Sequence, residues 1–275
     1  MARYTPTTLT LPPFSGTTRK LVLINVGVFF VLAILLWIVP AAGLLVLRYT
    51  ALVPAAVARG EIWQLVTYSV VEQSVVSLIF AMLTLWFTGA LLEGAYGSRW
   101  LRDLYWSSVI GGAGVASALS FTRVLGLRPA SVAVGPWAGI FGLLVAIAML
   151  MGDQEFYLWF LVRIKAKYLV AIYILIAVAV LLKNANSFGA LLQLAGGLCG
   201  FLYVRYAPRR GFGFGASERF YGLRNGYYRW KRRRAARKFE VYMRRQNREV
   251  HFDKEGRYID PEETRRDPND RKWMN

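Results

Sequence analysis

The stretch VGPWAGIFGLLVA, residues 134–146, places a bulky indole among small residues inside a long apolar run. Gly135, Gly139 and Gly142 recur three or four residues apart, which puts them on one face of a helix. Small residues at this spacing let helix backbones approach closely in lipid, where no hydrophobic force drives helices together. Trp137 interrupts this pattern with the largest side chain of all.

The 275-residue chain is strongly apolar, with 56% hydrophobic residues and a positive mean hydropathy. Apolar residues dominate its first three-quarters, and charges gather in the last quarter. Residues 205–275 carry 21 Lys and Arg against 10 Asp and Glu, in a chain with a net charge of +18. This asymmetry predicts a polytopic membrane domain followed by a basic tail outside the membrane.

Several apolar segments are long enough to cross a bilayer, which takes roughly 20 mostly apolar residues. Six segments qualify: residues 21–40, 65–92, 101–121, 134–151, 168–182 and 188–206. The fifth is short and could begin near Ile164. We therefore expect an all-α fold, with a six-helix membrane bundle in residues 21–206. It lies between a cytoplasmic N-terminal segment, 1–20, and a basic cytoplasmic tail, 207–275. Residues 41–64 keep apolar runs, so this loop is expected at the membrane interface.

The distribution of Lys and Arg predicts the orientation in the membrane, because cytoplasmic loops are enriched in both. The basic residues near 19–20, 99–102 and 163–167 fall on the same expected side as the tail. Both termini are therefore expected in the cytoplasm, which agrees with an even number of spans. We expect an integral multi-pass protein of the bacterial cytoplasmic membrane.

Residues that bind metals or form disulfides are scarce in this chain, since Cys199 is its single cysteine and His251 its single histidine. One cysteine cannot form an internal disulfide, and one histidine does not support a zinc site of ordinary ligands. We expect no metal and no cofactor. The acidic residues of the apolar region all lie near expected helix ends; they are Glu61, Glu72, Glu93, Asp103, Asp153 and Glu155.

Four stretches of the apolar region follow one another in a recognisable order. They read GEIWQLVTYSVVEQ (60–73), LIFAMLTLWFTGALLEGAYGSRWL (78–101), GPWAGIFGLL (135–144) and QLAGGLCGFLY (193–203). Together they resemble the rhomboid superfamily, the intramembrane serine proteases and their inactive relatives, over about residues 21–206. The first stretch departs from the family pattern, because it carries Trp63-Gln64 where a Trp-Arg pair is typical.

The resemblance also implies a set of structural positions, mostly glycines. They are Gly89, Glu93, Gly97, Gly135, Gly139, Gly142, Gly196 and Gly200. The glycines are expected where helices approach closely. Glu93 is expected near the cytoplasmic end of the second helix, paired with backbone groups or with Arg99 or Arg102.

The catalytic positions of active rhomboids would fall on residues of the wrong type. The resemblance places the nucleophile at Trp137, its general base at Gln193, and the oxyanion-side His and Asn at Ser77 and Ala81. A serine attacks only if an adjacent base takes its proton, and His251 lies about 45 residues beyond the last expected span. The sequence therefore predicts a pseudoprotease that lacks the Ser/His dyad rather than an enzyme.

The degenerate site allows two interpretations of Trp137. The favoured one is that the indole fills the old catalytic cavity and buries about 150–250 Å². The alternative is a plug or a ligand wall that keeps water out of the membrane interior. Gln193 is expected to hydrogen-bond across the bundle to Ser187, Ser77 or a backbone carbonyl.

The tail contains a predicted helix at 229–246, which lacks Gly and Pro, and a possible short hairpin at 249–260. Dense positive charge with aromatic residues can bind the anionic cytoplasmic leaflet, a cytoplasmic protein, or RNA including a ribosome. The candidate binding residues are Arg209, Arg210, Arg229, Lys231, Arg232, Arg233, Arg234, Arg237, Lys238, Phe239, Tyr242 and Trp273.

Our first interpretation is a non-catalytic rhomboid-like protein that binds transmembrane segments of clients or partner subunits. The groove would lie between the second and fifth helices, near Trp86, Phe87 and residues 168–174. The basic tail would dock a cytoplasmic partner or the anionic membrane surface. One alternative is a structural subunit of a larger membrane complex. A weaker alternative is a rhomboid-type intramembrane serine endopeptidase.

Overall fold

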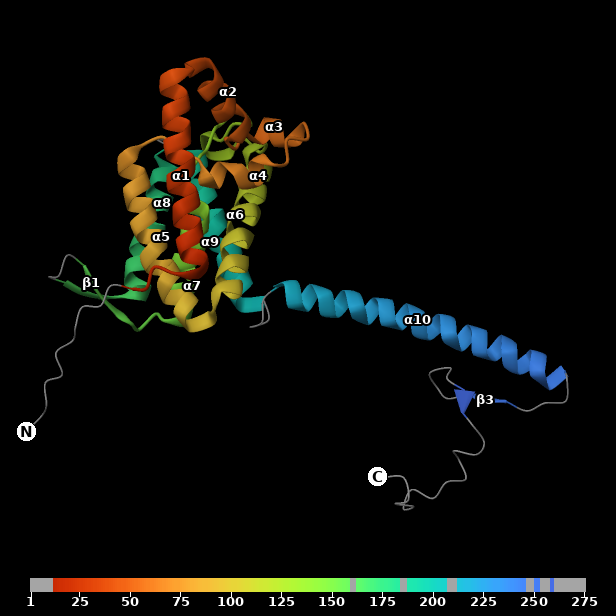
Figure 1. Ribbon diagram of the computed structural model, residues 1–275. Helices are drawn as coiled ribbons and strands as arrows, with labels where there is room; N and C mark the ends of the chain where they lie inside the picture. Colours follow the sequence, from red (N-terminus) through yellow and green to blue (C-terminus); the bar gives the residue numbers. More distant parts are fainter. Residues whose placement is uncertain are drawn as a thin grey trace, which may run out of the picture. The chain divides into compact units, whose positions relative to one another are not determined.

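The computed structural model describes residues 12–158, 162–183, 187–206, 212–245, 250–252 and 258–259. The chain divides into two compact units, residues 1–211 and residues 212–275. Each unit is described by itself. The first unit is a helix bundle, and the second contains one long helix and a short strand pair (Figure 1).

The bundle is built from long helices that run side by side (Figure 1). They are α1 (Gly16–Ile38), α5 (Val75–Tyr96), α6 (Ser98–Ser120), α7 (Trp137–Leu150), α8 (Ala166–Leu182) and α9 (Ser187–Tyr206). Helices α6, α7 and α9 contact one another at the centre; α1 and α5 pack together, and α8 packs on α7 and α9.

Shorter elements connect these helices. They are α2 (Pro40–Thr50), α3 (Pro54–Ala58), α4 (Gln64–Thr67), the 3₁₀ turns η1 (Tyr68–Val70) and η2 (Val124–Gly126), and the strands β1 (Glu155–Leu158) and β2 (Val162–Lys165). The two strands pair antiparallel between α7 and α8. The sequence did not predict this hairpin.

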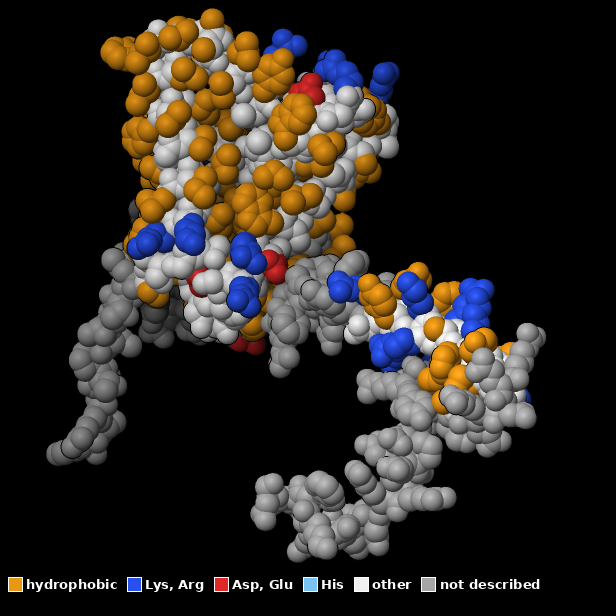
Figure 2. Space-filling model, turned by 45° about the vertical axis from the view of Figure 1, so that its right-hand side comes forward, with side chains coloured by type: hydrophobic (Ala, Val, Ile, Leu, Met, Phe, Trp, Pro, Cys, Tyr) orange, Lys and Arg blue, Asp and Glu red, His pale blue; other side chains and the backbone are white. Residues whose placement is uncertain are grey.

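The helical membrane fold is confirmed by length and composition. Among the described residues, α1, α5 and α9 are long and apolar enough to cross a membrane, and α7 and α8 are shorter apolar helices. On the face drawn in Figure 2, exposed apolar side chains cover the middle of the unit, and Lys and Arg gather near its two ends. The expected count of six crossings stays a prediction.

The continuous helix expected over residues 65–92 is wrong. Residues 64–70 form α4 and η1, the chain is non-helical at 71–74, and α5 begins only at Val75. The Ser74 side chain caps α5, because its Oγ accepts a hydrogen bond from the Ser77 N–H at 3.4 Å. Ser is a favoured N-cap residue, and three polar residues in a row interrupt the apolar run here.

Helix α9 lies against α6 and α7 with almost no side chain between the backbones. A Cβ atom on Gly196 would overlap the carbonyl oxygen of Ala138 on α7. A Cβ on Gly112 would lie 2.8 Å from the Cα of Gly196, and one on Gly200 would lie 2.6 Å from the Cα of Gly142. Glycine at these positions is therefore required by space, and the three central helices pack through their backbones.

Glu93, on the last turns of α5, holds the start of α1. Its carboxylate accepts hydrogen bonds from the Thr17 N–H at 2.7 Å, the Thr18 N–H at 2.9 Å and the Thr18 hydroxyl at 2.6 Å. The first N–H groups of a helix have no partner inside it, and its N-terminus attracts negative charge. Of the two kinds of partner expected for Glu93, backbone groups are found, although they come from a helix start 75 residues away in sequence. Among the described residues, neither Arg99 nor Arg102 pairs with it.

The two glycines around Glu93 serve the same junction. A Cβ on Gly89 would lie 2.8 Å from the Thr18 hydroxyl oxygen, so Gly89 lets α1 approach α5. Gly97 has φ of +86° and turns the chain directly from α5 into α6. The Ser98 hydroxyl, just after this turn, also donates to the Glu93 carboxylate.

The second unit contains α10 (Phe212–Arg245) and the strands β3 (His251–Phe252) and β4 (Tyr258–Ile259), which pair antiparallel. Helix α10 begins well before residue 229, where the sequence predicts the helix start. Each glycine in its first half costs about 1 kcal/mol of helix propensity relative to Ala, but the Arg, Glu, Leu and Ala residues between them favour the helix. The expected hairpin turn around Lys254 lies outside the described residues.

Candidate functional site

The segment that precedes α5 is fixed against the segment that precedes α7. The Gly135 N–H donates to the Tyr68 carbonyl oxygen at 2.9 Å, and Leu52 and Ala133 exchange two backbone hydrogen bonds. Gly135 has φ of +105°, a conformation that favours glycine, and the chain turns there into the start of α7. These contacts hold the non-helical residues 71–74 beside the first residues of α7.

Three of the four positions that the sequence analysis assigned to a degenerate catalytic site meet at one cavity. Trp137 is the first residue of α7, Ser77 lies in the first turn of α5, and Gln193 lies on α9. The Trp137 indole Nε1–H donates to the Ser77 hydroxyl oxygen at 3.4 Å. All three line a cavity of about 280 Å³, here called the polar cavity. Ala81, one turn further along α5, is fully buried and lies apart from its walls.

Glu72 also lines the polar cavity, and the sequence analysis did not single it out. It lies between η1 and α5, and its side chain is only 8% exposed. Oε1 accepts a hydrogen bond from the Gln73 N–H at 3.2 Å, whereas Oε2 has no hydrogen-bond partner among the described residues. Burial raises the pKa of this carboxyl above its usual value, although the Gln73 N–H and the Ser77 hydroxyl act in the opposite direction.

A second pocket of about 280 Å³ lies on the other side of Trp137 and Gln193. This central pocket is lined by α7, α8 and α9, and its walls include Phe141 and Tyr173. Trp137 and Gln193 belong to the walls of both spaces. The amide of Gln193 lies between the two spaces and makes no side-chain hydrogen bond to any described residue, and the expected bond across the bundle stays a prediction.

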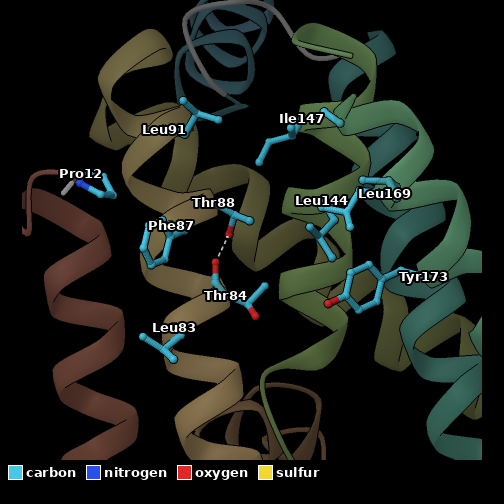
Figure 3. A pocket seen from close by; sticks show the side chains of 12 residues that line it. Pro12, Leu83, Thr84, Phe87, Thr88, Leu91, Leu144, Ile147, Leu169 and Tyr173 are labelled. Carbon is cyan, nitrogen blue, oxygen red and sulfur yellow. Dashed lines mark hydrogen bonds between the residues drawn. The ribbon is translucent and has the colours of Figure 1, made fainter. Parts of the chain in front are cut away.

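An apolar pocket of about 410 Å³ lies between α5 and α8, where the sequence predicted a groove (Figure 3). We call it the lateral groove. Leu83 and Phe87 line it from α5, and the Tyr173 ring projects from α8 toward Thr84 (Figure 3). Thr84 is the main polar residue near its centre, and its hydroxyl is bonded to the Phe80 carbonyl oxygen within α5 at 2.7 Å. Trp86 does not line the groove.

The basic side chains of α10 are exposed along the described part of the helix. Trp230 stacks with Tyr227, and the Arg234 guanidinium lies 5.4 Å from the Trp230 ring centroid. Phe239 packs edge-on against Phe252 in the strand pair, with ring centroids 6.3 Å apart. The predicted tail residues Arg209, Arg210 and Trp273 lie outside the described residues.

No group of three or more His, Cys, Asp and Glu side chains is placed to hold a metal ion within the part of the chain that the structure describes. Glu72 is the one acidic residue in the walls of the polar cavity. Its surroundings suit a hydrogen-bond donor or a positively charged group, because a buried carboxylate is stable only when it is paired.

Residues 23–220, well over half of the chain, match the family described as "Eukaryotic integral membrane protein (DUF1751)". The chain belongs to this family. The matched range contains the whole helix bundle from α1 to α9 except the first turns of α1, and it ends within α10. All residues that line the polar cavity lie in the matched range, as do those of the lateral groove except Pro12.

This chain is also similar to "Rhomboid-like protein 19" of Arabidopsis thaliana. The two are 31% identical over 176 residues, which cover 59% of this chain and 54% of the plant protein. The chain thus spans about half the length of that relative. This similarity confirms the rhomboid-like assignment made from the sequence.

The expected bacterial membrane is wrong for a member of this family, which is described as eukaryotic and whose relative is a plant protein. The sequence signals used for that expectation are hydropathy and the Lys and Arg distribution. Both report a bilayer and its two sides, but they are shared by bacterial and eukaryotic membranes. The protein belongs in a eukaryotic membrane.

Proposed function

We propose that this protein is a non-catalytic rhomboid-like membrane protein that holds transmembrane segments of other proteins in its lateral groove. The observation that carries the proposal is the apolar space of about 410 Å³ between α5 and α8, two helices with many exposed apolar side chains. In lipid, helices associate by packing, so an open groove lined mainly by apolar side chains favours another helix as its occupant.

The chemistry of the polar cavity supports a non-catalytic function. Attack by a hydroxyl requires a general base within hydrogen-bond reach. Trp137 and Gln193 stand where the family resemblance places the nucleophile and the base, and neither has the required chemistry. The remaining hydroxyl, on Ser77, accepts a hydrogen bond from the Trp137 indole and stands at neither the nucleophile nor the base position that the resemblance implies.

The proposed topology has six crossings, made by the six long helices of the bundle, and both termini in the cytoplasm. The end of the bundle where α1 begins carries Arg19 and Lys20, and α6 begins there with Arg99 and Arg102. Lys and Arg enrichment marks the cytoplasmic side. The polar cavity then lies near the opposite end, where α5, α7 and α9 begin.

The groove proposal predicts that Thr84→Trp abolishes helix binding, because an indole at this position fills the lateral groove. The protein would carry a photoreactive residue at Leu83 and be reconstituted in nanodiscs with a transmembrane peptide of Leu and Ala. We expect crosslinking to this peptide to fall at least about tenfold, the equivalent of 1.4 kcal/mol.

The matched control is Val76→Trp, which adds the same indole to the exposed face of α5, outside the groove. It should leave crosslinking unchanged. Equal capture by a photoreactive residue at Ile34, on the exposed face of α1, would contradict the proposal. A structural subunit would instead co-purify with one partner at a constant ratio through detergent washes.

We further propose that α10 lies on the anionic cytoplasmic leaflet. Its support is the combination of exposed Arg and Lys with the exposed aromatics Tyr228 and Trp230 on one helix. Each basic residue near such a surface contributes about 1 kcal/mol, and aromatic rings favour the interface.

This second proposal predicts that backbone amides of α10 exchange hydrogen more slowly in nanodiscs containing phosphatidylserine than in phosphatidylcholine alone. Replacing Arg232, Arg233 and Arg234 with Gln should remove most of this protection, because about 3 kcal/mol of attraction is lost. High salt should do the same. Protection that appears only with added protein or RNA would contradict the proposal.

A further inference from the structure

The polar cavity contains a carboxylate with one oxygen, Oε2 of Glu72, for which no described residue donates a hydrogen bond. Glu72 is more than nine-tenths buried, and its Oε2 has no hydrogen-bond partner among the described residues. A buried acceptor without a partner costs free energy in every folded molecule. Such a group is retained where something outside the chain supplies the missing donor.

The other described residues that line the cavity indicate the chemical type of this missing donor. They include the hydroxyl of Ser77 and the amide of Gln193, together with the backbone of residues 132–135. No Lys, Arg or His is among them. The cavity therefore presents one negative charge and neutral polar groups, an arrangement that suits a single ammonium or guanidinium group.

The central pocket shares wall residues with both the lateral groove and the polar cavity. Tyr173 lines both the groove and the central pocket, and Trp137 and Gln193 line both the central pocket and the polar cavity. A long, flexible side chain on a helix seated in the groove can follow these shared wall residues. Lys and Arg have apolar stems and charged ends, which match the apolar pocket and the carboxylate behind it.

We propose that the polar cavity binds the charged end of a Lys or Arg side chain carried by the transmembrane segment that the groove holds. The inference rests on the proposed groove function and adds a specificity to it. A basic residue in a transmembrane segment is costly in lipid and needs a partner of opposite charge. Glu72 is that partner, and Trp137 and Gln193 form the opening through which the side chain passes.

The same chemistry is offered by the ammonium group of phosphatidylethanolamine, but the cavity fits this source less well. A lipid headgroup carries a phosphate next to its ammonium group. No described wall residue bears a positive charge to pair with that phosphate, and Glu72 would repel it.

The test uses the full chain in phosphatidylcholine nanodiscs with fluorescent peptides of about 20 residues, enough to cross the bilayer. One peptide contains only Leu and Ala between its flanking anchors. Its partners carry a single Lys at about seven successive positions, two helical turns, in the half nearer the non-cytoplasmic end. The measurement is the dissociation constant of each peptide by energy transfer.

We expect one or two Lys positions on one helix face to bind about tenfold tighter than the Leu peptide, the size of one intramembrane polar contact. Glu72→Gln should abolish this preference. Gln193→Lys should abolish it as well, because an internal ammonium group then occupies the cavity. The Leu peptide, whose binding depends on the groove alone, reports whether each variant is folded.

The outcomes separate the inference from the groove function. If the Lys and Leu peptides bound with equal affinity, and Thr84→Trp abolished the binding of both, the inference would be overturned. The proposal that the groove binds transmembrane segments would still stand. No binding of any peptide would overturn both. Two results together would assign the cavity to the lipid headgroup: added phosphatidylethanolamine removes the preference for Lys peptides, and Glu72→Gln weakens binding of that lipid in native mass spectrometry. They would overturn the proposal that the ammonium or guanidinium group comes from a peptide.

Discussion

Replacing Gly196 with valine should unfold the helix bundle or reduce its stability by about 3 kcal/mol or more, the upper range of overpacking. The added Cβ would overlap the Ala138 carbonyl oxygen, and its γ-methyl groups would press α9 away from α6 as well. Backbone atoms of two packed helices cannot move aside as a flexible side chain can. The central helices would therefore separate, and the packing energy of all three would be reduced.

The measurement is the midpoint of thermal unfolding in detergent, together with the yield of monodisperse protein. Gly114→Val is the matched control, because a Cβ on Gly114 of α6 meets no atom within 4 Å. We expect the control to stay within a few tenths of a kcal/mol of the original protein. Equal midpoints for the two variants would show that α9 does not pack as described.

Glu93→Gln should cost about 2–4 kcal/mol, because three hydrogen bonds from the start of α1 and one from Ser98 end on this carboxylate. Hydrogen bonds to charged groups contribute about 1.5–3 kcal/mol. The amide keeps the shape of the side chain but loses the negative charge and one acceptor. The α1 N-terminus would then lose a favourable charge as well as partners for its N–H groups.

Hydrogen exchange at Thr17 and Thr18 would report the loss locally, and the unfolding midpoint would report it globally. Asp153→Asn serves as the control, since Asp153 is an exposed carboxylate in ion pairs with Lys165 and Lys167. Exposed ion pairs contribute little to stability. If both variants had the same unfolding midpoint, the hydrogen bonds to Glu93 would stabilise the fold no more than an exposed ion pair does.

Hydropathy predicted the helix order but not the break before α5. An average over about 20 residues treats three polar residues as a minor interruption, whereas Ser74 as an N-cap makes them a helix boundary. The partner of Glu93 was missed for a different reason. Local spacing pointed to a downstream arginine, and the partner found is the start of a helix 75 residues earlier, which only tertiary packing brings close.

Family spacing placed Ser77, Trp137 and Gln193, and the structure brings these three to one cavity. Glu72 could not be found in that way, because it matches no motif position. The sequence analysis grouped Glu72 with the acidic residues near expected helix ends, and only the structure shows its carboxyl in the wall of a buried cavity. The spacing of Gly196 and Gly200 predicted that α9 approaches another helix closely. It did not predict which helix each glycine contacts.

The length of α8 has a consequence for the lipid around the groove. Helix α8 has 17 residues, so at 1.5 Å per residue it extends about 25 Å, less than the ~30 Å thickness of a bilayer's hydrocarbon core. Lipids beside a short helix compress to match it, at fractions of a kcal/mol per Å. A guest segment next to α8 would therefore meet water and headgroups earlier along its length than in undisturbed bilayer, and a residue too polar for ordinary membrane would be tolerated there.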